Sequence, residues 1–213
     1  MFGTGITLGI PGVGCSPAGP PLTSGTASPT EQRLSTAPGS SRILLAYFSR
    51  AGENYHYGDR TFLQVGNTEV VANMIAEAIA LDVYRIEAAD PYPESYDATV
   101  DRNRDEQDDD ARPAIAGPLP NVDNYDTVLL GSPIWNQQPP MIMRTLTENA
   151  RLDGKTLTPF VTHAVSGLGS TVDVYQRLCP RSRIGDALAV RGEEAAGATA
   201  QVRDWVDRSG LRT

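Results

Sequence analysis

Residues 43–48 read ILLAYF, an apolar run that no polar residue interrupts. A strand with both faces buried in a parallel sheet has this pattern, because neither face needs polar side chains. We therefore expect residues 43–48 to be the first strand of a parallel sheet that helices cover on both sides.

Beyond this run, short apolar stretches alternate with amphipathic ones, as in βαβ units. Residues 68–80 carry apolar side chains at i, i+3, i+4, i+7 and i+8, which predicts a helix with one buried stripe. The other expected strands are 83–87, 127–132, 157–162 and 184–190, and the other expected helices are 96–109, 139–149, 172–179 and 195–208. Pro159 counts against the fourth strand, because proline in a sheet is normally confined to edges or bulges.

Composition narrows the class of protein. The chain has 213 residues, enough for one domain with a full core, and a net charge of -8 disfavours nucleic acid as a partner. Two cysteines and two histidines are too few for a zinc centre, so we expect no metal site. Residues 101–110 hold a run of carboxylates that either solvate a helix face or dock a basic protein.

Residues 1–41 differ from the rest, because Gly, Pro, Ser and Thr dominate and no apolar periodicity persists. We interpret them as a tail that precedes a domain at 42–213. Val13-Gly14-Cys15 resembles a lipoprotein cleavage box, which would make Cys15 a lipidated residue on an exported protein and its only link to a membrane. No Lys or Arg precedes Arg33, so the alternative is an ordinary tail on a cytoplasmic protein.

Loops that follow the strands are the expected ligand sites, because ligands collect at the carboxyl ends of parallel strands. Gly66-Asn67-Thr68 opens the first helix, where free N–H groups and the helix dipole favour a phosphate. Ser49 and Arg50 add a hydroxyl and a cation nearby. The alternative is that Asn67 only caps its helix. Neither a Walker sequence nor GxGxxG follows the first strand.

Two further loops carry candidates for contact with a flat ligand. Trp135 follows the third strand, where its ring either stacks on a ligand ring or packs in the core. After the fourth strand, Gly167 and Gly169 permit close backbone approach to a ligand. His163 is either part of that site or a structural histidine.

Several stretches together resemble the flavodoxin-like family over residues 42–211. They are ILLAYFSRAGEN, VGNTEVVA, DPYPESYDATVDRNRDEQ, GSPIWNQQPPM and GKTLTPFVTHAVSGLGST. The resemblance implies a three-layer α/β fold, a doubly wound five-stranded parallel sheet of order 2-1-3-4-5, with FMN as cofactor. It implies a phosphate site of Ser49, Arg50, Ala51, Asn67 and Thr68, and a flavin ring between Pro133, Ile134, Trp135 and Asn136 on one side and His163, Ala164, Gly167 and Gly169 on the other.

The sequence departs from the family pattern in two places. Residues 53–65 are inserted between Ser49 and Gly66-Asn67-Thr68, as either a flap over the site or a surface hairpin. The family's THGGSG loop is THAVSG here, with Ala164 and Val165 in place of its glycines.

The resemblance implies a protein that transfers electrons through FMN to a redox partner protein. An FMN-dependent NAD(P)H:quinone-type oxidoreductase with a small electron acceptor is the alternative, and neither needs a catalytic side chain. A hydrolase using Ser49 and His163 is disfavoured, because no GxSxG elbow is present. A binding lipoprotein that has lost the cofactor is a further alternative.

Overall fold

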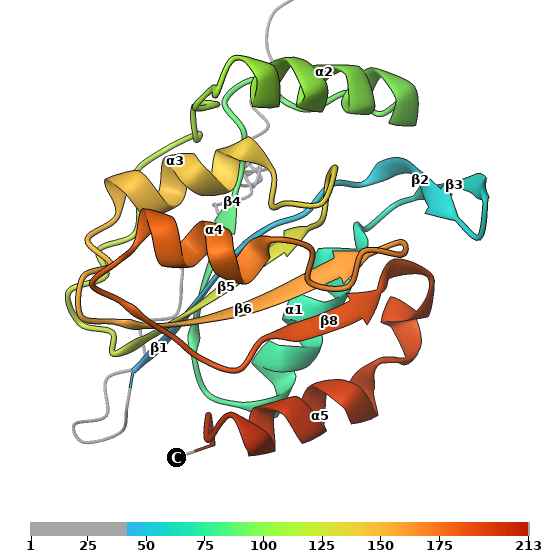
Figure 1. Ribbon diagram of the computed structural model, residues 1–213. Coiled ribbons are helices and arrows are strands. Elements are labelled where there is room, and N and C mark those ends of the chain that lie inside the picture. The colour runs from blue at the N-terminus through green and yellow to red at the C-terminus, as the bar shows by residue number, and fades with distance from the viewer. Residues whose placement is uncertain (1–41, 213) are drawn as a thin grey trace, which may run out of the picture. The chain divides into compact units, whose positions relative to one another are not determined.

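A computed structural model of the chain describes residues 42–212 (Figure 1). The predicted tail with Cys15 lies outside the described residues. In chain order the elements are β1 (Ile43–Phe48), β2 (Gly52–His56), β3 (Asp59–Leu63), α1 (Asn67–Ala78), β4 (Asp82–Ile86), α2 (Tyr96–Asp108), β5 (Thr127–Pro133), α3 (Met141–Asn149), β6 (Thr156–His163), α4 (Thr171–Leu178), β7 (Arg183–Ile184), β8 (Leu188–Arg191), the 3-10 helix η1 (Gly192–Gly197) and α5 (Thr199–Arg208). None of these helices has the length and apolar character that crossing a membrane requires.

The main sheet is parallel, with strand order β4-β1-β5-β6, and β7 and β8 both lie beside β6. This confirms the predicted doubly wound order 2-1-3-4-5. The predicted fifth strand, residues 184–190, is corrected in one respect. It is two short strands, β7 and β8, because residues 185–187 leave the sheet between them.

Pro159 accounts for this interruption. It lies inside β6, between β5 and the edge strands, so the expectation that it argues against a strand was wrong. The carbonyl of Leu157 accepts from Gly185 N on the edge side (2.8 Å), and the carbonyl of Thr162 accepts from Ile134 N on the opposite side (2.9 Å). Because backbone groups alternate sides along a strand, Pro159 faces the edge side. Its missing N–H therefore lies opposite the gap between β7 and β8.

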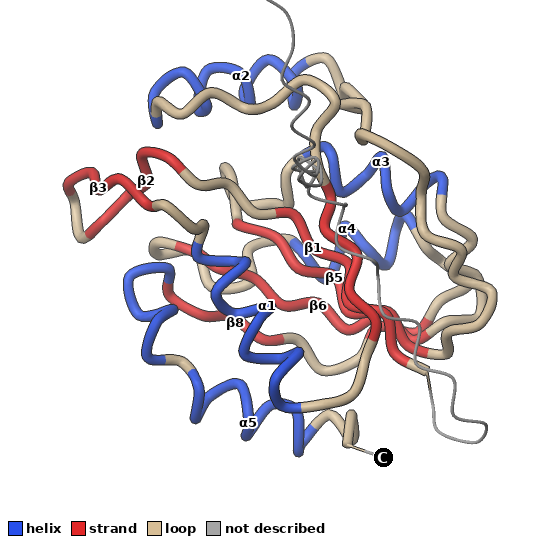
Figure 2. The backbone as a smooth tube through the Cα atoms, turned by 180° about the vertical axis from the view of Figure 1, so that it is seen from behind, coloured by secondary structure: helices blue, strands red, loops and turns tan. Residues whose placement is uncertain are grey.

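The core forms two layers, one on each face of the sheet. Along β1, Leu44 and Phe48 pack on the side of α3 and α4, while Leu45 and Tyr47 pack on the side of α1 and α5. Figure 1 shows α3 and α4 on one face and α1 and α5 on the other, and Figure 2 shows the second face from behind. All six residues of β1 are buried, as the uninterrupted apolar run predicts.

The inserted residues form an antiparallel hairpin, β2–β3, that stands outside the main sheet. In both views the hairpin projects from the end at which β1 finishes (Figures 1 and 2). The backbone N–H of Glu53 donates to the carbonyl of Glu94 (2.8 Å), which fixes the base of the hairpin to the loop before α2. The insertion therefore lies beside the loops in which the sequence predicts a ligand.

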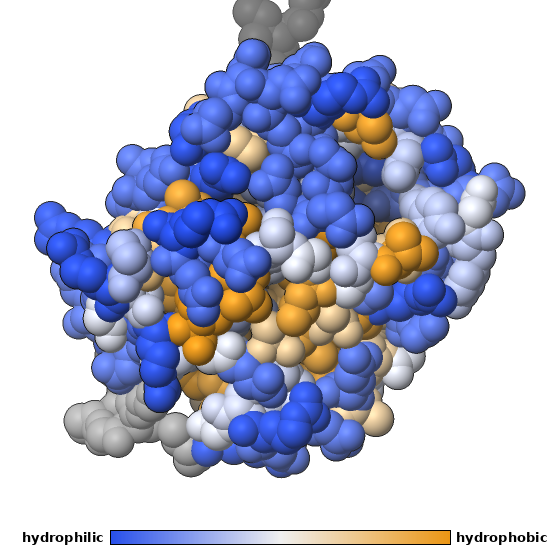
Figure 3. Space-filling model, viewed as in Figure 1, coloured by the Kyte–Doolittle hydropathy of each residue, from blue (hydrophilic) through white to orange (hydrophobic). Residues whose placement is uncertain are grey.

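The edge of the sheet at β8 is short. Figure 3 shows apolar side chains between the polar surfaces of α4 and α5, in the region where β8 runs. A strand of four residues, interrupted from β7 by a loop, offers few unpaired backbone groups to another chain. This geometry limits edge-to-edge association.

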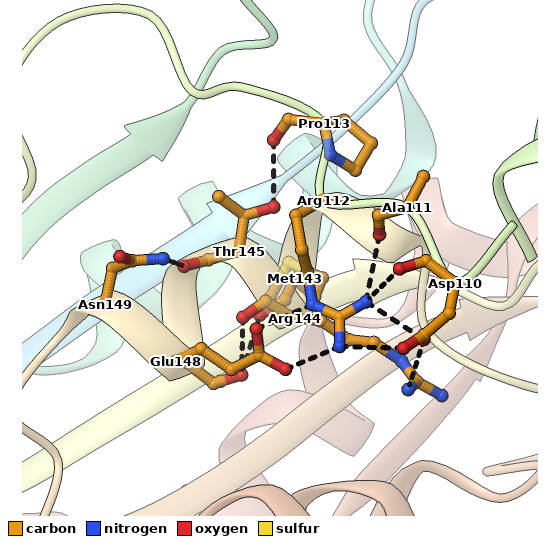
Figure 4. A network of polar contacts seen from close by, with 10 residues as sticks. Asp110, Ala111, Arg112, Pro113, Met143, Arg144, Thr145, Glu148 and Asn149 are labelled. Atoms are coloured by element: carbon orange, nitrogen blue, oxygen red, sulfur yellow. Dashed lines mark hydrogen bonds and ion pairs between the residues drawn. The ribbon is translucent and has the colours of Figure 1, made fainter.

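A group of charged residues joins the end of α2 to α3 (Figure 4). Arg112 forms paired hydrogen bonds with the Glu148 carboxylate, at 2.6 Å from Nε and 2.8 Å from an Nη. Asp110 contacts both Arg112 and Arg144, and Arg144 also donates to Gln138 Oε1 (3.1 Å). These contacts extend from α2 to the loop that follows β5.

Candidate functional site

A cleft opens where β1, β5 and β6 end. Strand ends and the start of α1 contribute most of its walls, as expected for an open parallel sheet. The predicted residues that line it are Ser49, Arg50, Asn67, Thr68, Pro133, Ile134, Trp135, His163 and Ala164. The structure therefore brings residues from all three predicted loops into one cleft. We call it the β1–β5–β6 cleft.

Four predicted site residues lie outside the lining. Ala51 is exposed and borders a neighbouring depression beside the base of the hairpin. Asn136 turns toward α2 and donates from Nδ2 to Gln107 Oε1 (2.7 Å). Gly167 and Gly169 have φ values of +57° and +51° and belong to the loop after β6.

The start of α1 presents free backbone donors to the cleft. Gly66 is the N-cap residue and has no side chain with which to cap the helix, so the interpretation of Asn67 as a cap was wrong. Ser49 Oγ accepts a hydrogen bond from Glu69 N (3.1 Å), which leaves the hydroxyl hydrogen of Ser49 available as a donor. Together with the helix dipole, these groups favour an anion.

Gly66 is needed for the close approach of two backbone segments. A Cβ atom at this position would lie 2.3 Å from Ser49 Oγ and 2.5 Å from the carbonyl oxygen of Arg50. Any side chain would push the loop after β1 away from the start of α1. On the other side of the helix start, Thr68 Oγ1 lies 2.7 Å from Thr162 Oγ1, which joins α1 to the end of β6.

Arg50 is largely committed to the fold. Its guanidinium donates to the backbone carbonyls of Pro93 (3.0 Å), Glu94 (3.1 Å) and Glu53. Only Nε has no partner among the described residues, and it is buried. Burial lowers the pKa of Arg50, an effect that the nearby Glu53 opposes. We conclude that Arg50 anchors the hairpin and that Nε is its one guanidinium nitrogen without a partner among the described residues.

Trp135 packs in the core and also borders the cleft. Its ring packs edge-on against Phe48 (5.6 Å between centroids) and Tyr92 (5.1 Å), and it also lines the cleft. The loop around it is tight, because Trp135 and Gln138 exchange backbone hydrogen bonds of 2.9 and 3.3 Å. Asn136 and Gln137 adopt positive φ to make this turn, which directs the Asn136 side chain toward α2.

The loop after β6 packs against the loop after β5 through its backbone. Ser170 donates from both N (2.7 Å) and Oγ (3.0 Å) to the carbonyl of Gln137. A Cβ atom at Gly169 would lie 2.3 Å from the same oxygen. The small size of Gly169 therefore serves contact between the two loops, which the sequence-based prediction assigned to a ligand.

His163 lies at the end of β6, with Nδ1 buried and without a partner among the described residues. Burial lowers the pKa of His163, and the positive charge of Arg191 lowers it further, while Glu193 opposes the shift. The imidazole is consequently neutral at neutral pH. It lines the cleft as an uncharged ring.

Six lining residues were not among the predicted ones: Asn54, Tyr55, Tyr96, Thr162, Gly192 and Glu193. Asn54 and Tyr55 come from the inserted hairpin. This segment is not part of the alternating strands and helices on which the prediction was based. Gly192 and Glu193 follow β8, and the rule that ligands gather after strands would have found them. The sequence-based prediction named no site residue after its fifth strand, residues 184–190.

Glu193 makes one contact that closes the cleft on its outer side. Its Oε1 accepts a hydrogen bond from the backbone N of Tyr57 at the tip of the hairpin (3.1 Å). Its Oε2 is buried and has no partner among the described residues. The hairpin thus spans from the loop before α2 to the segment after β8.

Comparison with known proteins identifies related sequences and folds. The family profile described as flavodoxin matches residues 42–209. No curated protein sequence matches the chain.

Solved structures share the fold over most of the chain. A protein of Bacteroides eggerthii assigned as a flavoprotein is 28% identical, with a TM-score of 0.66, and the alignment covers 81% of this chain and 100% of that one. A second such protein, from Bacteroides uniformis, is 26% identical, with a TM-score of 0.64 and coverage of 79% and 99%. A Lactobacillus acidophilus flavoprotein in complex with FMN is 19% identical, with a TM-score of 0.56 and coverage of 78% and 99%.

Proposed function

This chain belongs to the flavodoxin family, and we propose that it binds FMN in the β1–β5–β6 cleft and transfers electrons through the bound flavin. The observation that carries the proposal is the convergence of three strand-end loops on the start of α1. FMN carries both a phosphate and a flat ring. It therefore needs an anion site at the start of a helix next to loops that can contact the ring.

The phosphate end of the cleft fits an anion. The backbone N–H groups of Asn67 and Thr68 belong to the first turn of α1, in which Ser49 Oγ accepts only from the N–H of Glu69. Ser49 Oγ has a hydrogen to donate, and Arg50 Nε is a buried donor without a partner in the described part of the chain. Glu193 is the one carboxylate among the described lining residues, and its Oε1 accepts from the backbone N of Tyr57.

The ring end of the cleft fits a planar group. Ile134 and Trp135 come from the loop after β5, and His163 and Ala164 come from the end of β6 and the loop after it. Tyr55 reaches the same cleft from the hairpin, which reduces access of water. The chain's role is to bind, orient and shield the cofactor, and bound FMN supplies one- and two-electron redox chemistry.

A protein partner is the favoured source or destination of the electrons. The chain has a net charge of -8, and such a surface promotes encounter with a basic partner more than it raises the final affinity. We therefore propose an electron carrier that docks against a basic redox protein.

Absorption spectroscopy tests the proposal. The full chain, purified and then mixed with excess FMN and desalted, is expected to be yellow and to release flavin on denaturation. Riboflavin serves as the control ligand, because it lacks the phosphate that the start of α1 would bind. We expect much weaker retention of riboflavin, and a colourless protein after both treatments would overturn the FMN assignment.

A further inference from the structure

Tyr92 connects the wall of the β1–β5–β6 cleft to a buried carboxylate. Its ring packs edge-on against Trp135, with 5.1 Å between centroids, and against Phe48, with 5.3 Å. Its hydroxyl donates to Oε2 of Glu106 on α2 (2.9 Å). Trp135 lines the cleft, whereas Tyr92 and Glu106 are exposed to only 9% and 8%. Two oxidisable side chains and a proton acceptor therefore lie in contact, from the cleft wall inward.

The Glu106 carboxylate is held in place to receive a proton. Its Oε1 accepts a hydrogen bond from Arg102 Nε (2.8 Å), which forms an ion pair one helical turn apart. Arg102 also donates to the backbone carbonyls of Pro91 (3.0 Å) and Asp90 (3.1 Å), so the guanidinium is itself fixed. Because one carboxylate oxygen is bound in this way, the other oxygen meets the hydroxyl of Tyr92 in a defined geometry.

The surroundings of the Tyr92 ring favour the loss of a proton together with an electron. Burial raises the pKa of the Tyr92 phenol, and the negative charge of Glu106 raises it further, so the phenol is protonated at neutral pH. The Arg102 guanidinium lies 4.0 Å from the ring centroid, which disfavours a second positive charge on the ring. Oxidised Tyr92 would carry such a charge unless its proton left. Glu106 is the group placed to accept that proton.

A second tyrosine has the same kinds of partner but lies away from the cleft. Tyr125 donates to Oδ2 of Asp82 (2.7 Å), and the Arg42 guanidinium lies 5.2 Å from its ring centroid. Arg42 precedes β1, Asp82 begins β4 and Tyr125 precedes β5, so this pair lies at the opposite ends of the strands from the cleft. In the part of the chain that the structure describes, no aromatic ring packs against Tyr125. Of the two pairs, only Tyr92 and its carboxylate are connected to the cleft.

We propose that Trp135, Tyr92 and Glu106 form an electron relay, an inference that rests on the proposed function for its oxidant, the light-excited flavin. Trp135 gives one electron to the excited flavin and receives one electron from Tyr92. Tyr92 loses its phenolic proton to Glu106 Oε2 in the same step. The net change is one electron moved from Tyr92 to the flavin and one proton moved from Tyr92 to Glu106. The relay thereby removes the oxidised state from Trp135, which lines the cofactor cleft, and its reversal restores all three residues.

Pulse radiolysis of the full chain without FMN tests the relay itself. Azide radicals, the probe, oxidise the partly buried Trp135 in preference to Trp205, which is fully buried. We expect the absorbance of the tryptophan radical to decay as that of a tyrosyl radical grows, at a rate independent of protein concentration. Tyr92→Phe removes the electron donor and is expected to lose this conversion. Tyr125→Phe is the matched control and is expected to retain it.

Glu106→Gln tests the proton acceptor in the same experiment. Glutamine keeps an oxygen for the hydrogen bond from Tyr92 and removes the negative charge that receives the proton. We expect the conversion to slow by about 100-fold, the lower end of what a positioned proton acceptor contributes to a rate. Asp82→Asn, which removes the carboxylate of the other pair, is the control and is expected to leave the rate unchanged. Circular dichroism verifies that each variant is folded.

Illumination of the FMN-loaded full chain with blue light tests the oxidant. Electron paramagnetic resonance is expected to detect a tyrosyl radical in the unaltered chain and in Tyr125→Phe, and none in Tyr92→Phe. The FMN affinity of both variants should equal that of the unaltered chain, because neither tyrosine lines the β1–β5–β6 cleft.

The two experiments separate failure of the relay from failure of the proposed function. A tryptophan radical that decays without tyrosyl formation, or tyrosyl formation that persists in Tyr92→Phe, would overturn the relay and leave the FMN assignment intact. An unchanged rate in Glu106→Gln would remove Glu106 as the proton acceptor. A chain that shows the conversion but takes up no FMN would overturn the proposed function, and with it the flavin as oxidant, while electron transfer from Tyr92 to Trp135 would stand.

Discussion

The backbone N–H of Tyr57 donates to Oε1 of Glu193 across 3.1 Å, joining the tip of the β2–β3 hairpin to the segment after β8. At its base the same hairpin is fixed by Glu53, whose backbone N–H donates to the carbonyl of Glu94. The hairpin is therefore held at both ends, and Tyr55 between them lines the β1–β5–β6 cleft.

Loss of the contact at the hairpin tip should accelerate the release of FMN. Glu193→Ala removes the acceptor for Tyr57 N, whereas Glu193→Gln keeps an oxygen at the same place and removes only the charge. Because a hydrogen bond of this kind contributes about 0.5–1.5 kcal/mol, we expect FMN to dissociate about 2- to 10-fold faster from the alanine variant than from the glutamine variant.

Stopped-flow fluorescence, with a flavin scavenger to prevent rebinding, measures both rates. Alanine and glutamine are both uncharged, so both variants lack the repulsion between the Glu193 carboxylate and the phosphate. The two rates therefore differ only through the contact with Tyr57 N. Equal dissociation rates would show that the Tyr57–Glu193 contact does not limit access to the cleft.

Gly66→Ala should abolish tight FMN binding while the domain stays folded. The new Cβ would meet Ser49 Oγ at 2.3 Å and the Arg50 carbonyl oxygen at 2.5 Å, which separates the loop after β1 from the start of α1. Gly197→Ala is the control, because its Cβ would meet nothing within 4 Å. Circular dichroism and an FMN titration distinguish the two effects, and unchanged affinity in Gly66→Ala would contradict a phosphate site here.

Stability should fall on acidification because of His163. Burial and Arg191 lower the pKa of His163 in the folded state, so below about pH 6.5 the unfolded chain binds more protons than the folded chain. The contribution of His163 to stability is therefore largest above its unfolded pKa. It declines as the pH falls through about 6.5 toward the lower folded value.

Urea unfolding of the FMN-free chain at about pH 7.5 and 5.5 measures this effect. The unaltered chain is expected to lose more of its unfolding free energy between the two conditions than His163→Gln, since all other titrating groups are common to both. Equal losses in the two proteins would mean that the imidazole titrates alike in the folded and unfolded chains.

Arg112→Ala should destabilise the junction of α2 and α3 by about 0.5–1 kcal/mol. Hydrogen bonds to Glu148, and to a smaller extent to Asp110, raise the pKa of Arg112. Arg112 therefore belongs to a network with two carboxylates and not to a single exposed ion pair (Figure 4). Salt should reduce the effect, because partly exposed charges are screened.

Thermal and urea unfolding at low and high salt measure the loss. Arg181→Ala is the matched control, because Arg181 forms an isolated pair with Asp153 in which the side chains are 77% and 56% exposed. We expect no measurable change for Arg181→Ala. A similar change in both variants would show that the network adds nothing beyond an ordinary surface pair.

The order of elements followed from the sequence, because apolar runs and helical spacing are local patterns. Residues 43–48 appear as β1 with the predicted bounds, and the amphipathic stripe of residues 68–80 appears as α1 with Val71 and Ile75 fully buried. The split of the last strand did not follow. The split depends on the backbone of Pro159 facing the edge side of β6. Which side of a strand faces the edge of the sheet is known only once the neighbouring strands are placed.

The candidate site was predictable where it lies at strand ends. Ser49, Trp135 and His163 come together in the β1–β5–β6 cleft because parallel strands finish at the same edge of the sheet. Gly169 was given to a ligand, whereas its contact is the carbonyl of Gln137 in another loop. The sequence shows that a glycine is present, but it does not show which atom approaches the glycine in the folded chain.

By itself, then, the sequence determined the α/β class, the strand order through the family resemblance, and the three loops that line the β1–β5–β6 cleft. Tertiary structure decided that the hairpin reaches Glu193, that Arg50 bonds backbone carbonyls, and that Tyr92 bonds Glu106 of α2. The physical reason is range. Apolar periodicity acts over a few residues, whereas these contacts join groups as far apart in the chain as Tyr57 and Glu193.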